Sequence, residues 1–339
     1  MIYKIKKGWM ITILLPAFSA AQDIHSSQFY NTAIFLNPAV AGTFDRNYRF
    51  MANYRNQWSS VTAPYVTMGG AFDMWFTKNK SVCGGLTFYN DKAGDSKFGT
   101  MQVNLLLSTV HQINKENLIS GGIQAGYVQN SITYSGLTWD SQYRNGVYDP
   151  AASTNEPNNG SESFSFIDAG AGAYWMGKIN NEFRMNAGLA AQHLSFPKYT
   201  FPSYSKATEK KDIRLNILGT AQYDLKNTNT SFLPGLLVQQ QGKAREIVVG
   251  TLIKYTLGLT SRYTGAYTSS ALYLGLHYRT GDALIAAVVF DYQKYFTAGV
   301  SYDFNISGLT PASNSLGGME FLVHIPVTSQ NQKTSVKLK

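Results

Sequence analysis

The chain has 339 residues, of which 44% are hydrophobic and 14% aromatic, but only 14% are charged. A soluble domain normally carries about 25% charged residues, so this composition argues against an ordinary soluble protein. The net charge of +9 is not clustered as in a nucleic-acid-binding protein, because the dense basic run is confined to the C-terminal end. We therefore expect no nucleic-acid partner.

Residue types that bind metals or catalyse reactions are sparse. Cys83 is the single cysteine, which excludes an intramolecular disulfide and a cysteine metal site. The five histidines show no pair at ligand spacing, and the strong motifs of serine hydrolases, phosphate loops and zinc proteases are missing from the sequence. We expect no metal, no cofactor and no enzymatic activity.

The N-terminus has the three parts of a secretory signal peptide. Lysines at positions 4, 6 and 7 precede an apolar run at residues 9–18, and Ser19-Ala20-Ala21 supplies small residues for cleavage. The apolar run is shorter than the roughly 20 residues that a membrane-spanning helix needs. We expect residues 1–21 to be removed and the mature chain to begin at Gln22.

Residues 36–42 predict a fixed bend before the first strand. Asn37 precedes a proline and is therefore disfavoured in a helix, the ring of Pro38 fixes its own φ, and Gly42 can adopt the positive φ of a sharp turn. We expect residues 22–43 to form a periplasmic or plug-like segment, at or inside the periplasmic mouth of the barrel that the following residues predict.

From residue 44 onward, short segments alternate between apolar and polar side chains, which is the period of a β-strand. Near the C-terminus, for example, Phe321 and Val323 alternate with Glu320 and His324. Alternation, low charge and abundant aromatic residues are together typical of a transmembrane β-barrel, in which alternate residues face lipid. A large soluble β-sandwich or barrel would explain the alternation but not the shortage of charge.

We therefore predict an all-β fold, a transmembrane outer-membrane β-barrel of about 14 antiparallel strands within residues 44–328, followed by a basic C-terminal tail at 329–339. An even number of strands is what a single-chain bacterial barrel requires. The predicted strands are 47–56, 65–76, 82–90, 98–110, 118–130, 164–176, 183–193, 211–223, 231–240, 245–256, 270–280, 282–291, 295–304 and 318–327.

The lengths of the connections predict which end of the barrel faces outward. The long connections 131–163, 194–210 and 305–317 all follow odd-numbered strands, and short turns such as 114–117 follow even-numbered strands. Bacterial barrels have long extracellular loops and short periplasmic turns, so the long connections are expected outside the cell. We expect these loops, with the numerous aromatic side chains, to obstruct the lumen.

Charged residues on the inward side of three predicted strands are expected to form a network. By alternation, Arg49 and Arg55 share the inward side of the first strand and oppose Tyr54, while Asp303 opposes Tyr302. The strand that closes the barrel lies between them and carries Glu320. Because unpaired ions are costly in a lumen with few charges, we expect these groups to pair; the alternative is that each contacts lumen water.

Several segments resemble one known family. The run SQFYNTAIFLNPAVAGT, the motif YRNQW at residues 54–58, the run VSYDFNISGL at residues 300–309, and GMEF at residues 318–321 are similar to signatures of the PorP/SprF family of outer-membrane proteins in the type IX secretion system of Bacteroidetes. The resemblance is specific at both ends and loose in the middle. The chain departs from the family at Met319, where a histidine is common.

The resemblance implies a location in the outer membrane of a Gram-negative bacterium and a role in type IX secretion and gliding. Implied partners are outer-membrane lipid, a secreted cargo such as a surface adhesin with a C-terminal sorting domain, and components of the translocon or its periplasmic ring. The alternatives are a porin-like channel or a lipid or solute transporter, and an outer-membrane enzyme. The candidate partner-binding or structural residues are Asn37, Pro38, Gly42, Arg49, Tyr54, Arg55, Gln57, Trp58, Tyr302, Asp303 and Glu320.

Overall fold

The computed structural model describes residues 23–59, 63–154, 160–202, 209–258, 269–293, 295–308 and 310–328. The predicted signal peptide at 1–21 and the predicted basic tail at 329–339 lie outside these described residues. In the described part of the chain, no helix is both long and apolar enough to cross a bilayer.

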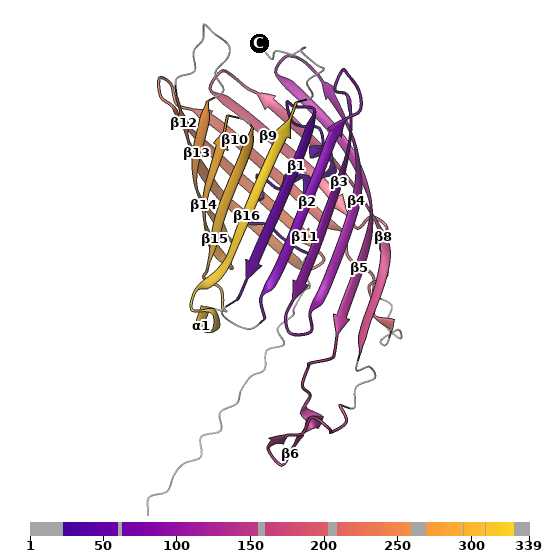
Figure 1. Ribbon diagram of the computed structural model, residues 1–339. Helices are drawn as coiled ribbons and strands as arrows, with labels where there is room; N and C mark the ends of the chain where they lie inside the picture. Colours follow the sequence, from indigo (N-terminus) through magenta and orange to yellow (C-terminus); the bar gives the residue numbers. More distant parts are fainter. Residues whose placement is uncertain are drawn as a thin grey trace, which may run out of the picture.

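The strands form a closed antiparallel barrel, in which β1 pairs with β16 to complete the ring (Figure 1). The predicted all-β barrel is therefore confirmed, with each predicted strand present. The barrel strands are β1 (Tyr48–Gln57), β2 (Tyr65–Trp75), β3 (Val82–Ala93), β4 (Phe98–Gln112), β5 (Asn117–Thr133), β8 (Ser161–Lys178), β9 (Phe183–Gln192), β10 (Arg214–Asp224), β11 (Thr230–Gln241), β12 (Ala244–Leu257), β13 (Ser270–Arg279), β14 (Ala283–Tyr292), β15 (Phe296–Asn305) and β16 (Leu316–Val327).

Short elements complete the described structure. They are the strands β6 (Tyr143–Arg144) and β7 (Val147–Tyr148), which form a separate hairpin, the 3-10 turns η1 (Ala33–Phe35), η2 (Pro38–Val40) and η3 (Asp140–Gln142), and the helical turn α1 (Thr310–Ser313). The sequence did not predict β6, β7 or η3 in the connection 131–163, because elements of two or three residues are too short to show a period.

The strand register places apolar side chains outside and mixed side chains inside. In β16, Phe321 and Val323 are exposed on the outer surface, whereas Glu320 and Leu322 are buried in the interior. The same alternation in β1 buries Arg55 and exposes Tyr54. Because a closed barrel pairs its strands all the way round, no strand edge has to face lipid within the hydrocarbon layer.

The two ends of the barrel differ in their connections. The connections 134–160, 193–213 and 306–315 meet at one end, which we call the loop end, at the bottom of Figure 1. Turns such as 113–116 lie at the opposite end, the turn end, where β12 also ends and β13 begins. Strand parity predicts that the loop end faces the cell exterior.

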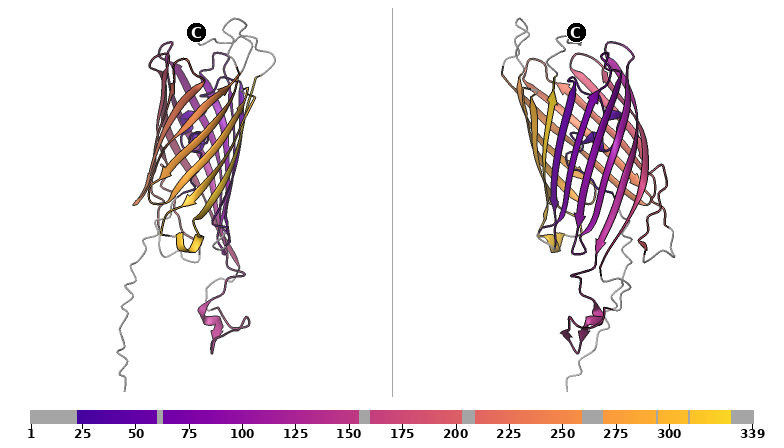
Figure 2. Two further views of the ribbon diagram at one scale, coloured as in Figure 1. Left: turned by 90° about the vertical axis from the view of Figure 1, so that its left-hand side faces the viewer. Right: turned by 45° about the vertical axis from the view of Figure 1, so that its right-hand side comes forward.

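Residues 23–43 run through the interior of the barrel, and we call them the lumen segment (Figure 2). Phe29, Ile34, Phe35, Leu36 and Val40 of this segment are buried against inward-facing side chains of the strands. Burial of each such side chain contributes about 1.5–3 kcal/mol. An apolar core therefore occupies the space where a porin holds water. The strand residues of this core include Met51, Leu106, Leu218, Leu237, Val248, Ile285 and Leu322.

The lumen segment crosses the barrel from one end to the other. Asp23 contacts His193 and Lys211 at the loop end. Gly42 packs beside Cys83, at the turn end, just before β1 begins. The plug-like part of the prediction for residues 22–43 agrees with this path, but the segment is not confined to one mouth of the barrel, because the ionic partners of its first residues lie at the end opposite to Gly42. We expected aromatic side chains and the long loops to obstruct the lumen; the buried core contains aromatic side chains such as Phe29 and Phe35, but they come from this segment.

The predicted bend fixes the middle of the lumen segment against the wall. Asn37 caps η2 by accepting a hydrogen bond from the Ala39 backbone N–H (2.9 Å), and its side chain donates to the carbonyls of Ala173 (2.9 Å) and Leu189 (3.3 Å). One side chain thus ties the bend to β8 and β9. On β5, Gly122 faces the bend so closely that a Cβ there would lie 2.5 Å from backbone atoms of residues 38 and 39.

The close approach at Gly122 predicts that Gly122→Ala destabilises the barrel. The added methyl would push the lumen segment away from β5, and overpacking of this kind costs about 1–3 kcal/mol. The neighbouring Gly121 faces outward, with nothing within 4 Å of a Cβ, so Gly121→Ala is a matched control that should not destabilise. Urea unfolding of the purified protein in detergent measures both. Equal midpoints for the two variants would contradict the close packing.

Candidate functional site

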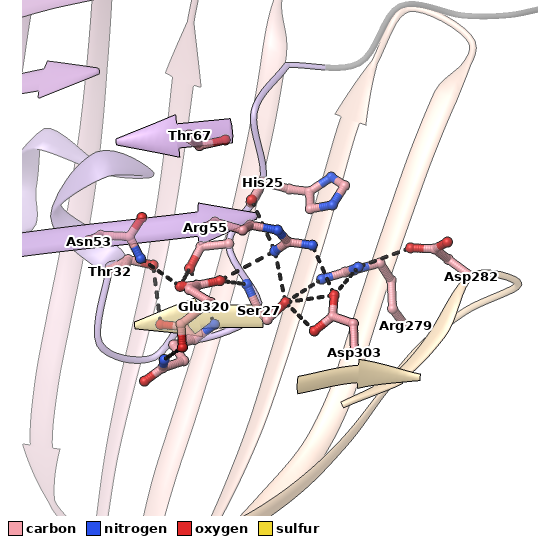
Figure 3. A network of polar contacts seen from close by, with 12 residues as sticks. His25, Ser27, Thr32, Asn53, Arg55, Thr67, Arg279, Asp282, Asp303 and Glu320 are labelled. Carbon is pink, nitrogen blue, oxygen red and sulfur yellow. Dashed lines mark hydrogen bonds and ion pairs between the residues drawn. The ribbon is translucent and has the colours of Figure 1, made fainter. Parts of the chain in front are cut away.

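A buried network of ions joins the two strands that close the barrel to their neighbours (Figure 3). Arg55 of β1 pairs with Asp303 of β15 (Nη2 to Oδ2, 2.9 Å) and with Glu320 of β16 (Nη1 to Oε2, 3.3 Å). Strand register places Arg55 directly opposite Glu320. Arg55 is only 2% exposed and Glu320 only 1%, so both charges depend on protein partners for their stabilisation.

Arg279 at the end of β13 is the second cation of this network. Its Nη1 lies 3.0 Å from Asp303 and 2.9 Å from Asp282, and its Nε lies 3.8 Å from Glu246. Asp303 therefore lies between two guanidinium groups. Removing either cation from such a buried arrangement would leave a carboxylate without its counter-charge, which is far more costly than losing an exposed pair.

Ser27 of the lumen segment lies at the centre of these charges. Its hydroxyl accepts hydrogen bonds from Arg55 (2.8 Å) and Arg279 (3.0 Å) and donates to Asp303 (2.6 Å). Its backbone N–H donates to Glu320 (2.6 Å). We call Ser27, Arg55, Arg279, Asp303 and Glu320 the seam network, because they tie the lumen segment to the strands on either side of the β1–β16 seam.

A second cluster fixes the beginning of the lumen segment at the loop end. His193, which follows β9, lies between the carboxylates of Asp168 (Nδ1 to Oδ2, 2.8 Å) and Asp23 (Nε2 to Oδ2, 2.5 Å). The ammonium of Lys211 lies 2.6 Å from the other oxygen of Asp23, and Arg214 lies 3.8 Å from Asp23. We call this group the Asp23 cluster.

A third ionic contact lies at the turn end, where the lumen segment leads into β1. Arg49 binds Asp73 of β2 through two nitrogens, at 2.8 and 2.7 Å. Arg49 also donates to the carbonyl of Val40 (3.1 Å), and Asp73 accepts from the backbone N–H of Gly42 (2.9 Å). Gly42 has the predicted positive φ, +81°, which lets its N–H point at this carboxylate.

The structure brings together only some of the candidate residues. Arg55, Asp303 and Glu320 meet in the seam network, as predicted. Arg49 faces the lumen, as expected, but its partner is Asp73, because the register of β1 and β2 sets those two residues opposite each other. The expectation of a network that includes Arg49 is therefore wrong for that residue.

The remaining candidates lie outside the ionic clusters. Tyr54 is on the outer surface of β1, and Tyr302 packs against Phe304 on the outer side of β15 (ring centroids 4.9 Å apart). Gln57 is the last residue of β1, at the loop end. Trp58 follows it with a left-handed backbone conformation (φ +55°), and the centroid of its ring lies 4.8 Å from that of Tyr65. These four residues take no part in the seam network. Asn37, Pro38 and Gly42 form the bend of the lumen segment.

The sequence analysis missed several residues of these clusters. Arg279 and Asp73 have inward parity in predicted strands, so strand alternation could have flagged them. Ser27 and Asp23 lie outside the predicted strands, so no period reveals the direction of their side chains. His193 is the last residue of the predicted strand 183–193, but β9 ends at Gln192, so alternation does not apply to it.

The chain matches the model of the family described as type IX secretion system membrane protein PorP/SprF over residues 18–324. The chain belongs to the PorP/SprF family. The resemblance found in the sequence is thereby confirmed, and this PorP/SprF protein is an outer-membrane β-barrel component of type IX secretion. No curated protein matches it.

Solved structures of other bacterial barrels are similar to this PorP/SprF protein at low identity. The toluene transporter TbuX of Ralstonia pickettii is 11% identical, with a TM-score of 0.46, over 86% of this chain and 92% of that chain. A FadL homologue of Pseudomonas aeruginosa is 9% identical, with a TM-score of 0.47, over 86% of this chain and 93% of that chain. At these values the likeness adds nothing to the barrel that the structure itself shows.

The seam network predicts that Arg279→Ala is strongly destabilising. The substitution leaves Asp303 and Asp282 without one of their cations, and breaking a buried pair costs about 3–5 kcal/mol. Arg245, exposed at the loop end of β12 and bonded to Gln240, gives a matched control, and Arg245→Ala should change stability by less than about 0.5 kcal/mol. Urea midpoints in detergent compare the two. A small effect of Arg279→Ala would show that the network contributes little.

The Asp23 cluster predicts a pH-dependent stability. Burial disfavours the charged form of Asp23, but Lys211 and His193 outweigh it and hold the pKa of Asp23 well below 3.8, so its contribution is lost only as the pH falls below that value. Burial also opposes the charged form of His193, but hydrogen bonds to Asp168 and Asp23 raise its pKa above 6.5. The contribution of His193 is therefore complete below pH 6.5 and is lost as the pH rises through that raised pKa.

Raising the pH from about 6 to about 9 should therefore lower the urea midpoint of the wild-type protein, because His193 loses its proton while Asp23 stays ionised. His193→Asn cannot titrate in this range, so its midpoint should depend less on pH. A wild-type midpoint that falls no more steeply than that of His193→Asn would contradict this role of the histidine.

Proposed function

We propose that this PorP/SprF protein is a closed outer-membrane anchor that supports the export or surface retention of a secreted cargo protein, such as a large adhesin with a C-terminal sorting domain. The observation that carries the proposal is the filled lumen. Residues 23–43 occupy the interior with an apolar core, and ionic clusters hold them at both ends. A barrel sealed in this way is suited to hold a partner on its surface.

The channel alternative requires a continuous polar path, and the lumen segment stands in its way. Phe29, Phe35 and Leu36 are each buried by more than nine tenths among strand side chains, and an ion would have to displace them. The seam network and the Asp23 cluster would have to be broken at the same time. Transport of solutes or lipids is therefore the second candidate function, after the binding of a cargo protein.

The residues with charge in the interior support a structural role in place of catalysis. The charged residues of the seam network form ion pairs with one another and hydrogen bonds with Ser27, so each already has partners within the fold; they are Arg55, Arg279, Asp303 and Glu320. We propose that the protein acts by binding. Contacts with the translocon or its periplasmic ring would then be made by the turn end, which strand parity assigns to the periplasm.

Planar bilayers and cells test the two halves of this proposal. The purified protein should give no steady conductance, whereas a variant without residues 23–43, if it still forms the barrel, should conduct because its core is removed.

In cells of the native bacterium, deleting the gene should lower the amount of at least one surface protein several-fold, and restoring the gene should recover it. Steady porin-like currents through the wild-type protein, or an unchanged set of surface proteins, would contradict the proposal.

A further inference from the structure

The hairpin of β5 and β8 projects beyond the rest of the barrel at the loop end (Figure 1). β9 pairs with β8 only as far as Gly170. β8 continues to pair with β5 as far as Ser161. In the part of the chain that the structure describes, residues 161–169 of β8 therefore pair with a strand on the β5 side alone.

The outward side chains of this hairpin change from apolar to polar along its length. Tyr127 of β5 and Ile167 of β8 form the last apolar pair, and Ile167 is 65% exposed. A lipid-facing surface is apolar throughout the hydrocarbon layer, so the hairpin beyond Ile167 stands in water. The pairs beyond it are Gln129–Ser165, Ser131–Ser163 and Thr133–Ser161.

Alternate residues of β8 direct their backbone groups to the open side. The carbonyl of Ala169 does so, because it accepts a hydrogen bond from the Leu194 N–H (2.9 Å), and the hydroxyl of Ser195 reaches the carbonyl of Ile167 (3.0 Å). By the same period of two, the N–H and C=O groups of residues 161, 163 and 165 face the open side. Among the described residues, no backbone hydrogen bond covers these three on that side.

Among residues 161–167, this edge has no lysine, no proline and no bulge, and its one charged residue is Glu162. Proteins commonly place lysine, proline or a bulge on a free edge, whereas residues 161–167 read SESFSFI. On the inner face, Phe164 packs against Tyr199 and Phe201, with ring centroids 5.3 and 4.9 Å away. An added strand would find free backbone groups in line with β8 and an aromatic layer on one face.

We propose that the Ser161–Ile167 edge of β8 is the docking site for an extended strand of the exported cargo, added antiparallel to β8; this rests on the proposed function. Main-chain hydrogen bonds would provide affinity, and the alternation of side chains would provide specificity. The inserted segment should be about five to seven residues long. Its apolar side chains should face Phe164 and its polar side chains should face water.

A second copy of this chain fits the edge less well. Two copies inserted in the same direction in one membrane have β8 running the same way, so their β8 edges can pair only as parallel strands. Parallel pairing is slightly less stable per residue than antiparallel pairing. A segment of a secreted protein that arrives from outside the barrel has no such restriction on its direction.

The test uses Ser163→Pro and its matched control Ser163→Ala in the full-length protein. Proline removes the N–H at the centre of the open edge but leaves the β5 side of the ladder intact, whereas alanine removes only the hydroxyl. The probe is a fluorescein-labelled peptide of alternating threonine and valine, with binding followed by fluorescence anisotropy in detergent. Ser163→Pro should bind about tenfold more weakly than Ser163→Ala, which should match the wild type. Heat-resistant migration of the folded band checks that both variants form the barrel.

The same two variants are then compared in cells with a strain that lacks the protein. Loss of a surface protein in the Ser163→Pro strain, but not in the Ser163→Ala strain, supports the docking site. Equal peptide binding by the two variants overturns the proposed docking site. A dimer in detergent that Ser163→Pro dissociates and Ser163→Ala does not would assign the edge to a second copy and would also overturn it. If Ser163→Pro loses peptide binding but keeps the surface protein that the null strain loses, this docking site is wrong and the proposed function stands. A null strain that keeps all its surface proteins contradicts the proposed function itself.

Discussion

The buried charges around Ser27 determine how the rest of this molecule is held together. A guanidinium or a carboxylate that leaves water must recover its lost hydration from fixed partners, and here two arginines and two acidic residues do so around one serine. Because Ser27 belongs to the lumen segment and the charges belong to β1, β13, β15 and β16, no strand can complete this set alone. The N-terminal segment and the seam of the barrel are therefore stabilised as one unit.

The apolar core inside the barrel is stabilised by removing apolar side chains from water and not by pairing charges, but it also holds the lumen segment inside the barrel. Burial of Phe29, Phe35 and Leu36 gains free energy without fixing direction, while the ionic contacts at each end fix position. Together they make the interior resemble the core of a soluble protein enclosed by a lipid-facing wall. The filled interior leaves no room for a partner inside the barrel.

Strand alternation predicted a large part of this architecture. It placed each of the fourteen strands and the inward side of Arg55, Asp303 and Glu320, because a period of two is a local property of the chain. It placed the start of β8 at residue 164, whereas the strand begins at Ser161, where backbone pairing with β5 begins. It did not assign Asp73 to Arg49, because a cross-strand partner follows from the register, which the turns and the whole sheet set.

The sequence by itself thus determined the class of fold, the number of strands, the bend at Asn37 and Pro38, and which side of each strand faces inward. The tertiary structure decided that residues 23–43 cross the lumen, that Ser27 meets four charged groups, and that β8 extends beyond the end of its pairing with β9. The physical reason is range. Alternation and turn propensity act between residues close in sequence, whereas the contacts of Ser27 with Arg279, Asp303 and Glu320 join residues more than 200 positions apart and form only once the barrel has closed.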